Sequence, residues 1–347
     1  MRIAFLLPSL VKTAPIIIAA NIIKHIKDQC ESVEVFYFKD IIEFDIGVPV
    51  RQLNFSSPFS FENFDILHTH MYKPDMYVKL HRKKIKCKTV STLHTFIKND
   101  VFNIYPFPKN YLITYSWYGA LRKHDALVCL NQSMRAYYQK RYPLHKIYMV
   151  NNGIEKDTYH DKTTIEEANQ LAALKKSYKI IGTTSSLIKR KGLEILIPFL
   201  QQNKDYTWFA AGEGSFDKIL KSYAEKAGVL DRCIFAGNKK NISAFYPWFD
   251  IFAFPSRSEG FGLSLAEAAI YRRPIICSDI EVFRELFTEE EVAFFSLDNV
   301  NSFNDGIKKL EESPKTYGDK AYARTMKCYT AATMAQNYLS IYKEILN

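Results

Sequence analysis

The sequence has no uninterrupted apolar run long enough to span a lipid bilayer. Its six cysteines are scattered, and no two of them have the C-x-x-C spacing of zinc sites or dithiol redox motifs. Most of them lie inside apolar runs such as ALVCL and PIICS, so we expect reduced thiols in the core of a cytoplasmic protein rather than disulfides or metal ligands. Low-complexity tracts and short repeats are also missing, which favours an ordinary globular chain.

Signatures of several function classes are missing as well. No G-x-G-x-x-G follows the first predicted strand, where Pro8–Pro15 reads PSLVKTAP, so a nucleotide-dependent oxidoreductase or epimerase on a Rossmann sheet is not favoured. Helix-turn-helix, zinc-finger and RNA-binding signatures are absent, and we expect no nucleic-acid partner. The formal net charge of +10 still favours an anionic partner, such as a phosphorylated substrate or an anionic membrane face, unless the lysines serve only solubility.

The first twelve residues, MRIAFLLPSLVK, have the apolar character of a short signal peptide. Pro8 and Lys12 interrupt the apolar run, however, and no clear cleavage site of small residues follows. We therefore expect these residues to form a first buried strand.

Short apolar runs, often β-branched, alternate with longer helical patterns along the whole chain. This alternation is typical of parallel sheets with helices on both faces. The predicted strands are Arg2–Leu7, Val33–Phe38, Asp65–His68, Thr89–Leu93, Ala126–Leu130, Ile147–Val150, Lys179–Thr184, Tyr206–Ala210, Cys233–Ala236, Ile251–Phe254 and Pro274–Ser278. The predicted helices are Ile16–Lys27, Asp75–Lys84, Ser133–Arg141, Leu193–Gln202, Phe216–Ala227, Ile242–Trp248, Leu263–Arg272 and Tyr317–Leu346.

The 347 residues are enough for two domains, and we predict an α/β fold of two Rossmann-like, doubly wound domains. The first spans residues 1–160 and the second residues 161–325, with the boundary near the polar stretch Lys156–Lys176. We expect residues 326–347 to form a helix that packs back on the first domain. Ligands of such sheets bind beyond the carboxyl ends of the strands, so a cleft between two domains would collect loops from both.

Three loops that follow predicted strands of the second half are rich in cations or glycines. Three cations precede a predicted helix in the segment Leu187–Gly192, LIKRKG. Free backbone N–H groups at the start of that helix would complete an anion site. Gly212 and Gly214, in a G-E-G turn, permit a close ligand approach, as does the segment Gly237–Lys240. Each loop taken alone is equally consistent with a solvated turn.

The stretch Ser258–Ala268, SEGFGLSLAEA, separates two apolar strands and carries two glutamates eight positions apart. Its Gly-Phe-Gly turn lets the backbone bend toward a ligand, and Ser264 begins a helix whose N–H groups favour a phosphate. Glu267 shares a helix face with Ser264 and could accept hydrogen bonds from the vicinal hydroxyls of a ribose. Glu259 would then hold a sugar one diphosphate length away. A helix-capping Glu259 and a surface Glu267 are also consistent with the sequence.

The run Phe254–Ala268, FPSRSEGFGLSLAEA, closely resembles the E-x7-E signature of the retaining GT-B glycosyltransferases of family 4. Further segments resemble the same family in the expected order. They are VNNGIE at Val150–Glu155, the K-G pair Lys191-Gly192, AGEG at Ala211–Gly214, and two strand ends with histidines, DILHTH at Asp65–His70 and VSTLH at Val90–His94. The resemblance covers nearly the whole chain and implies two Rossmann-like domains that face a central cleft.

The resemblance also implies roles for individual residues. Glu259, which would hold the transferred sugar, and His94, beside that sugar, are the implied catalytic residues, while Glu267 would hold the ribose. The other implied donor-binding residues, which would bind the diphosphate or approach the donor closely, are Ser186, Arg190, Lys191, Gly212, Gly214, Gly262, Leu263 and Ser264. We expect His68, at one strand end, to be structural.

Two departures from the family pattern affect the implied phosphate contacts. The family usually has an arginine a few residues before the K-G lysine, where this sequence has Ser186, so Arg190 or Lys189 would supply the charge. The first loop usually has a pair of glycines that approach the donor phosphate, and this loop has none. Lys12 and Thr13 are then the expected contacts from the first loop.

The resemblance implies transfer of a sugar, with retention, from a nucleoside-diphosphate sugar to a saccharide acceptor. A UDP-sugar is the favoured donor, and the acceptor is expected to be lipid-linked or part of a lipopolysaccharide or surface polysaccharide. No D-x-D sequence occurs, so we expect no metal ion, and no cofactor beyond the donor itself. The two departures keep one alternative open, a non-catalytic or partner-dependent glycosyltransferase-like subunit.

Two stretches of the first half suit contact with an anionic lipid surface. Leu80–Lys88, LHRKKIKCK, is basic, and Phe102–Lys123 is rich in tyrosine, phenylalanine and tryptophan. We therefore expect the cytoplasmic protein also to bind, as a peripheral protein, to the cytoplasmic face of the inner membrane. A solvated, charged helix face beside a cluster of core aromatic residues is equally consistent with these stretches.

Overall fold

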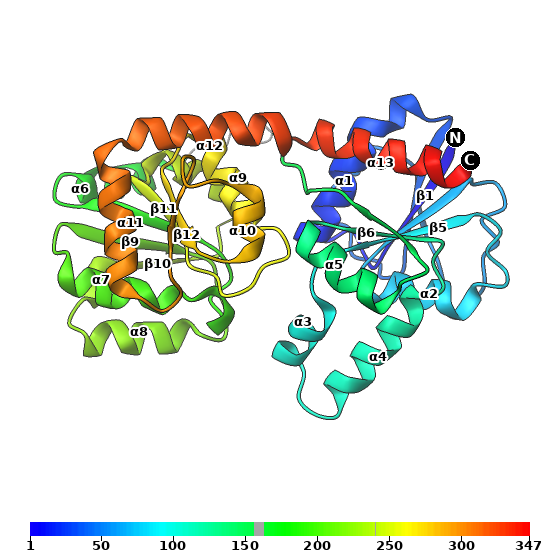
Figure 1. Cartoon of the computed structure of the whole chain (residues 1–347), viewed down its shortest axis with the longest axis horizontal. Helices are drawn as coiled ribbons and strands as arrows, with labels where there is room; N and C mark the ends of the chain where they lie inside the picture. Colours follow the sequence, from blue (N-terminus) through cyan, green and yellow to red (C-terminus); the bar gives the residue numbers. More distant parts are fainter. Residues whose placement is uncertain (156–162, 240) are drawn as a thin grey trace. The chain divides into compact units, whose positions relative to one another are not determined.

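The computed structural model describes residues 1–155, 163–239 and 241–347 and divides into two compact units (Figure 1). Unit 1 comprises Met1–Ile154 and Thr330–Asn347, and unit 2 comprises Glu155–Tyr329. The predicted boundary at 160/161 lies outside the described residues. The chain returns to unit 1 at Thr330 rather than at the predicted 326, because helix α12 (Pro314–Cys328) continues within unit 2.

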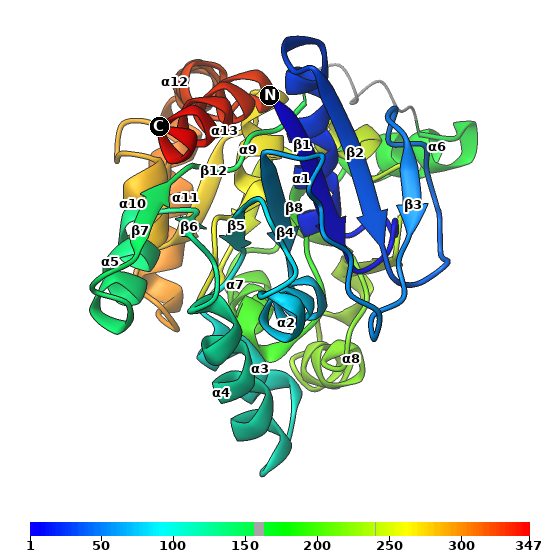
Figure 2. The same cartoon turned by 90° about the vertical axis from the view of Figure 1, so that its right-hand side faces the viewer.

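The sheet of unit 1 is parallel and has the strand order β3-β2-β1-β4-β5-β6-β7, which Figure 2 shows from right to left. Its strands are β1 (Arg2–Leu7), β2 (Ser32–Tyr37), β3 (Val50–Gln52), β4 (Ile66–His70), β5 (Lys88–Leu93), β6 (Ala126–Cys129) and β7 (Lys146–Met149). Its helices before the return are α1 (Ala14–Ile26), α2 (Tyr72–His81), α3 (Ile97–Ile104), α4 (Lys109–Leu121), α5 (Gln132–Arg141) and the 3₁₀ turn η1 (Lys27–Gln29). The central strands β1 and β4 are buried almost throughout, as expected for a parallel sheet with helices on both faces.

Unit 2 repeats this plan with the strand order β10-β9-β8-β11-β12-β13, again parallel. Its strands are β8 (Lys179–Thr184), β9 (Tyr206–Ala211), β10 (Cys233–Gly237), β11 (Ile251–Phe254), β12 (Ile275–Ser278) and β13 (Ala293–Phe295). Its helices are α6 (Ile165–Lys175), α7 (Leu196–Gln202), α8 (Asp217–Lys226), α9 (Leu263–Ile270), α10 (Glu281–Leu286), α11 (Val300–Glu312) and α12, with the 3₁₀ helices η3 (Lys189–Lys191), η4 (Leu193–Ile195), η5 (Leu230–Arg232) and η6 (Ile242–Trp248). Trp208, Phe199 and Phe303 belong to its buried core.

The last helix, α13 (Ala331–Leu346), completes unit 1 and lies beside α1 (Figure 1). The chain is fixed where it enters this helix, because Ala331 donates its backbone N–H to the carbonyl of Ile154 at 2.8 Å. Gly153 makes this close approach feasible, since a Cβ there would lie 2.2 Å from the carbonyl oxygen of Thr330. The buried face of α13 includes Tyr338 and Tyr342, which reach the centre of the unit 1 sheet.

The predicted fold class of two doubly wound α/β domains is confirmed, and each predicted strand overlaps a strand of the structure. The prediction of one helix over Tyr317–Leu346 was wrong, because an extended Thr330 separates α12 from α13. The predicted helix Ile242–Trp248 is a 3₁₀ helix that contains Pro247, which has no N–H to donate. The predicted helix Leu193–Gln202 begins as the 3₁₀ turn η4 before α7. The elements that sequence reasoning missed are β3, β13, α3, α4, α6, α10 and α11 and the 3₁₀ helices η3 and η5.

Candidate functional site

The two glutamates of the E-x7-E stretch follow the buried strand β11. Glu259 lies in the loop after the strand, and Glu267 lies on α9, whose first residue is Leu263. Gly262 precedes the helix with a φ of 97°, a conformation that residues with a Cβ disfavour. A Cβ at Gly262 would also come within 3.0 Å of the Phe283 ring. The glycine therefore sets the direction in which α9 begins.

Glu259 is the centre of a nearly buried ion cluster. Its Oε1 accepts a hydrogen bond from Lys191 Nζ at 2.5 Å, and its Oε2 lies 3.4 Å from Arg190 Nη1. The side chains of Lys191 and Glu259 are only 12% and 9% exposed. Burial alone would raise the pKa of Glu259, but Lys191 and Arg190 outweigh it and hold that pKa below its ordinary value. The carboxylate is thus ionised at neutral pH and only accepts hydrogen bonds.

The turn that carries Lys191 is held against the β11 loop. Gly192 has a φ of 64°, and a Cβ there would lie 2.1 Å from the carbonyl oxygen of Pro255. Arg257 donates its backbone N–H to the carbonyl of Arg190 at 2.9 Å and its Nη1 to the carbonyl of Lys189 at 2.7 Å. The same guanidinium pairs with Glu194 at 2.9 Å. Arg257 therefore joins the two loops that supply the ion cluster.

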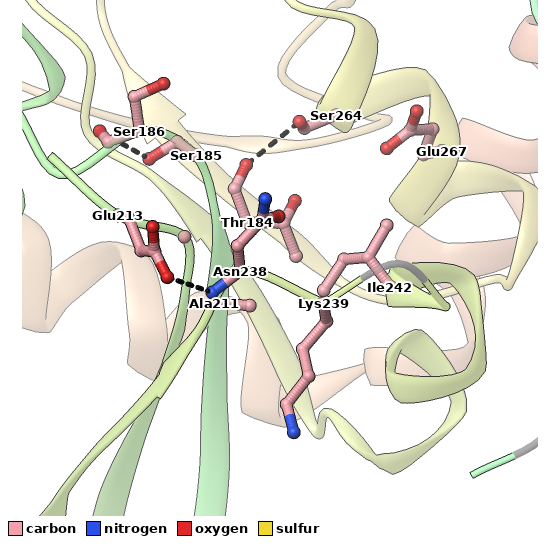
Figure 3. A pocket seen from close by; sticks show the side chains of 11 residues that line it. Thr184, Ser185, Ser186, Ala211, Glu213, Asn238, Lys239, Ile242, Ser264 and Glu267 are labelled. Carbon is pink, nitrogen blue, oxygen red and sulfur yellow. Dashed lines mark hydrogen bonds between the residues drawn. The ribbon is translucent and has the colours of Figure 1, made fainter. Parts of the chain in front are cut away.

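A pocket of about 300 Å³ lies at the carboxyl ends of β8, β9 and β10 and at the start of α9 (Figure 3). It brings together four of the residues implied for donor binding, which are Ser186, Gly212, Ser264 and Glu267. Ser264 donates its hydroxyl to the carbonyl of Thr184 at 3.0 Å, which ties the first turn of α9 to the end of β8. The position of the pocket matches the rule that ligands of parallel sheets bind beyond the carboxyl ends of the strands.

Glu267 is oriented from within the core of unit 2. The buried Tyr246 of η6 donates its hydroxyl to Glu267 Oε2 at 2.6 Å, and the same hydroxyl lies 2.8 Å from Thr184 Oγ1. Sequence reasoning missed both Tyr246 and Arg257. Arg257 lies inside the recognised stretch, where its charge was a signal, whereas nothing in the sequence links Tyr246 to Glu267.

The glycines of the G-E-G turn lie against backbone. A Cβ at Gly212 would lie 2.0 Å from the carbonyl oxygen of Ser185, and one at Gly214 would lie 2.2 Å from that of Leu187. The backbone N–H of Leu187 in turn donates to the carbonyl of Glu213 at 2.9 Å. These two glycines therefore allow the β9 loop to pack on the β8 loop, which carries Ser186.

Unit 1 gathers histidines at the carboxyl ends of β4 and β5. Nδ1 of His70 lies 2.8 Å from Nε2 of His94. Burial lowers the pKa of His94 to about 4, against a smaller opposing effect of Asp75. It lowers the pKa values of the fully buried His68 and His70 well below the ordinary histidine value. All three rings are thus neutral at pH 7 and act through hydrogen bonds rather than charge.

His68 is connected to the C-terminal helix, as the structural role expected for it suggests. Its Nδ1 lies 2.6 Å from the hydroxyl of Tyr342, and its Nε2 lies 2.7 Å from Thr92 Oγ1. Thr92 Oγ1 lies 2.9 Å from the hydroxyl of Tyr338. One consistent direction of donation runs from Tyr342 through His68 and Thr92 to Tyr338, so all three hydrogen bonds form between neutral groups.

The first loop of unit 1 is extended and lies against the segment that follows β2. Leu10 donates its N–H to the carbonyl of Ile41 at 3.0 Å, and Lys12 donates its N–H to Glu43 Oε2 at 2.8 Å. Thr13 is the N-cap of α1, and its side chain makes no capping hydrogen bond. The loop is thus supported by a neighbouring segment rather than bent by glycines, and Lys12 and Thr13 stay predicted contacts.

The structure therefore brings Ser186, Gly212, Ser264 and Glu267 together at the pocket, and Arg190 and Lys191 around Glu259. Gly262 and Leu263 lie at the start of α9, and Gly214 packs on the β8 loop. His94, Lys12 and Thr13 belong to unit 1. Within residues 1–155, 163–239 and 241–347, no group of three or more histidine, cysteine or acidic side chains is arranged to hold a metal ion. Among the helices of the same residues, none is long and apolar enough to cross a membrane.

Two family models match the chain. The model described as glycosyl transferases group 1 matches residues 164–325, and the model described as glycosyltransferase family 4 matches residues 49–158. The chain is 27% identical to the O-antigen biosynthesis glycosyltransferase WclY of Escherichia coli over 99% of each chain. It is 25% identical to the lipopolysaccharide core biosynthesis mannosyltransferase LpsB of Rhizobium meliloti, over 65% of this chain and 67% of that protein.

Solved structures share the fold. HepE of Anabaena, crystallised in complex with UDP, aligns with a TM-score of 0.82 at 18% identity over 99% of this chain and 100% of that one. WaaG, a glycosyltransferase involved in lipopolysaccharide biosynthesis, aligns with a TM-score of 0.74 at 15% identity over 98% of this chain and 99% of that one. At these identities the likeness concerns the fold, which is that of the GT-B glycosyltransferases.

Proposed function

Since the chain belongs to the group 1, family 4 glycosyltransferases and is therefore a transferase of sugars, we propose that it moves a sugar from a UDP-sugar to a saccharide acceptor with retention. The acceptor that we propose is a lipid-linked or lipopolysaccharide-type saccharide. The names of its relatives from Escherichia coli and Rhizobium meliloti support this class of acceptor. The UDP in the Anabaena structure supports a uridine nucleotide.

The observation that carries the proposal is that two carboxylates of unit 2 have different partners and different surroundings. Glu259 is ionised and paired with Lys191 and Arg190, whereas Glu267 lies at the neighbouring pocket and is bound by a neutral phenol. A nucleotide-sugar has hydroxylated groups at both ends and a diphosphate between them. Lys191 and Arg190 match the diphosphate, Glu259 matches the sugar hydroxyls and Glu267 matches the ribose.

The proposed step breaks the bond between the anomeric carbon and the diphosphate oxygen. The acceptor oxygen bonds to the same face of the anomeric carbon, and its proton passes to the departing diphosphate. Lys191, Arg190 and the backbone N–H groups at the start of α9 stabilise the charge that develops on that leaving group. Glu259 orients the sugar and does not attack it. Because cations of the chain neutralise the diphosphate, we propose that the reaction needs no metal ion.

Turnover of a panel of UDP-sugars and GDP-sugars in the presence of EDTA tests this proposal. We expect slow release of UDP from one UDP-sugar, faster release with a saccharide acceptor, and retained anomeric configuration in the product by NMR. Glu259→Gln should abolish turnover without unfolding the chain. Turnover that appears only after Mg²⁺ is added, or an inverted product, would contradict the corresponding part of the proposal.

We also propose that unit 1 contacts an anionic membrane surface through the hairpin of α3 and α4, which projects from its sheet (Figures 1 and 2). Five large apolar or aromatic side chains of this hairpin are between 44% and 78% exposed. They are Ile104, Phe107, Tyr111, Leu112 and Tyr115. No acidic residue occurs between Asp100 and Asp125. An apolar face without negative charge suits insertion at an anionic interface.

Cations surround this apolar face. Lys98 and Lys109 lie over the rings of Phe102 and Tyr105 at 5.7 and 4.7 Å. At the other end of α4, Arg82 donates to the carbonyl of Lys123 at 2.9 Å, which joins the basic stretch Leu80–Lys88 to the hairpin. Cations at both ends of an apolar helix favour anionic over neutral lipid.

Sedimentation with vesicles tests the membrane proposal. The chain should bind vesicles of phosphatidylcholine and phosphatidylglycerol more strongly than vesicles of phosphatidylcholine alone. Leu112→Asp should reduce this binding, whereas the control Leu144→Asp, at a leucine that is 97% exposed outside the hairpin, should not. Equal losses in the two variants would contradict a role for the hairpin.

A further inference from the structure

Three hydroxyl and carboxyl groups from separate elements of unit 2 form one line that ends at Glu267. Thr184 Oγ1, at the end of β8, lies 2.8 Å from the hydroxyl of Tyr246 in η6. That hydroxyl donates to Glu267 Oε2 on α9 at 2.6 Å. Because the phenol has one proton and gives it to the carboxylate, the hydroxyl of Thr184 donates to the phenol oxygen. Successive hydrogen bonds that end on a charged acceptor strengthen one another.

The aromatic ring of Tyr246 is held by the core rather than by the pocket. Tyr246 is fully buried, and its ring stacks on Tyr271 with centroids 5.5 Å apart. Phe249 and Phe252 pack on it with centroid separations of 5.8 and 5.5 Å. A buried phenol in such a setting has few alternative rotamers and needs a partner for its hydroxyl. The position of the hydroxyl is therefore fixed before any ligand arrives.

We propose that Tyr246 is a positioning residue, whose hydroxyl fixes the carboxylate of Glu267 in the orientation that receives the vicinal hydroxyls of a nucleotide ribose. The inference rests on the proposed donor site and adds to it a residue outside the pocket lining. A carboxylate has about four acceptor positions, and Tyr246 occupies one of them. Fixing the carboxylate plane lowers the conformational entropy that Glu267 loses when the ribose binds.

Unit 2 also offers a matched control. Tyr206, which is 2% exposed, donates its hydroxyl to Glu311 on α11. Like Tyr246, it is a buried tyrosine bonded to a glutamate of unit 2, but neither Tyr206 nor Glu311 lines the pocket. Replacing either tyrosine by phenylalanine removes one hydroxyl and keeps the ring. A difference between the two variants therefore reports the position of the hydroxyl rather than the loss of a buried hydrogen bond as such.

The test is calorimetric titration of UDP and of 2′,3′-dideoxy-UDP into the wild type, Tyr246→Phe and Tyr206→Phe. The wild type should bind UDP more tightly than the dideoxy compound, because only UDP offers the vicinal hydroxyls. Tyr246→Phe should reduce this preference about tenfold, a typical effect of one hydrogen bond to a charged group. Tyr206→Phe should keep the wild-type preference. In turnover, Tyr246→Phe should raise KM for the UDP-sugar and leave kcat nearly unchanged, because the ribose contact is made before and during the reaction alike.

The outcomes separate the inference from the function on which it rests. A wild type that prefers UDP, together with a Tyr246→Phe variant that prefers it equally, would overturn the positioning role and leave the donor site intact. A wild type without any preference for UDP would contradict the ribose contact itself, and with it both proposals. If Tyr246→Phe fails to fold, Thr184→Val takes its place, since it removes the hydroxyl that donates to the phenol, from a residue that also lines the pocket. It should reduce the preference for UDP about two- to threefold, and an unchanged preference would again overturn the positioning role.

Discussion

The two units share one architecture but handle polar groups at the carboxyl ends of their strands in opposite ways. Unit 2 pairs ionised side chains, with Lys191 and Arg190 on Glu259, and its sheet lies beside the pocket. Unit 1 gathers buried histidines there, and His68, His70 and His94 have pKa values lowered by burial. The buried carboxyl of Asp75 accepts hydrogen bonds from Thr69 and Ser91 beside them. The two cations that meet a nearly buried carboxylate thus lie in the unit that we propose holds the diphosphate, where fixed cations stabilise a leaving group most effectively.

Acid should affect the two units differently, and this is the largest effect that we expect. A histidine that burial keeps neutral destabilises the folded chain as the pH falls from about 6.5 toward 4. The reason is that the unfolded chain takes up the proton first. Each such histidine contributes up to about 1.4 kcal/mol per pH unit. Glu259, whose pKa is lowered, behaves differently, since its contribution is present above the ordinary glutamate pKa and is lost only as the pH falls below that value.

Hydrogen exchange measured by mass spectrometry at pH 7.5 and 5, corrected for the intrinsic pH dependence of exchange, compares the units within one sample. Peptides of β4 and β5 should lose protection between these pH values, while peptides of β8 and β11 should largely keep it. The three histidines whose pKa values burial lowers all lie in unit 1, so the contrast should be clear. Equal losses in both units would contradict the comparison.

The cations of unit 2 should matter most for the reaction. Lys191→Met removes a positive charge from the proposed leaving-group site and leaves Arg190 as the cation beside the buried Glu259. We expect kcat/KM for the donor to fall by a factor of about 100 to 1,000, which corresponds to roughly 3 kcal/mol or more. The exposed Lys189, two positions earlier in the same turn, provides the control. A comparable loss in Lys189→Met would indicate that only the overall charge of the turn matters.

The turn that holds Lys191 should tolerate little change. Gly192→Ala combines a φ of 64° with a Cβ that would lie 2.1 Å from the carbonyl oxygen of Pro255. Gly228 has a nearly equal φ of 67° but no atom within 4 Å of an added Cβ. Gly228→Ala should therefore cost only the conformational term of about 1 kcal/mol, and Gly192→Ala about 2 kcal/mol or more. Thermal denaturation of the two variants checks the difference, and equal shifts would argue against a rigid turn.

The neutral network of unit 1 should show the smallest effect. Tyr342→Phe leaves Nδ1 of the buried His68 without its partner, at a cost of about 1 kcal/mol or somewhat more. Tyr148→Phe removes another hydroxyl bonded to α13, but this one lies at the surface and binds Glu344 at 2.7 Å. Its loss should cost less than about 0.5 kcal/mol. Hydrogen exchange of α13 peptides measures both losses of stability. Tyr342→Phe should reduce protection more than Tyr148→Phe, and the reverse order would contradict this prediction.

The sequence predicted the site best where its parts are close together along the chain. Glu259, Gly262 and Glu267 lie within one strand–turn–helix segment, so their spacing predicted their common location. Lys191 is 68 positions from Glu259, and only the family resemblance connected the two residues before the structure did. Most of the β-strands were predictable because buried parallel strands are continuous apolar runs, whereas the three-residue strands β3 and β13 were missed.

Contacts between residues far apart along the chain could not be predicted from the sequence. Tyr342 and His68 are 274 positions apart, and Thr92 and Tyr338 are 246 positions apart. No local pattern indicates which face of the last helix meets which strand. The first loop illustrates the same limit, because Ile41 and Glu43 support it from a segment after β2 that has no regular pattern of its own.

The central claim is that Glu267 and Glu259 hold opposite ends of one donor, and calorimetric titration of Glu267→Gln and Glu259→Gln with two ligands tests it directly. The ligands are UDP and the UDP-sugar that the enzyme turns over. Glu267→Gln should weaken both ligands alike, because both contain the ribose. Glu259→Gln should weaken only the UDP-sugar, and it should leave UDP binding unchanged or improved because Lys191 and Arg190 are released from the carboxylate. A Glu259→Gln variant that loses both ligands equally, or a Glu267→Gln variant that still binds UDP as the wild type does, would contradict the account.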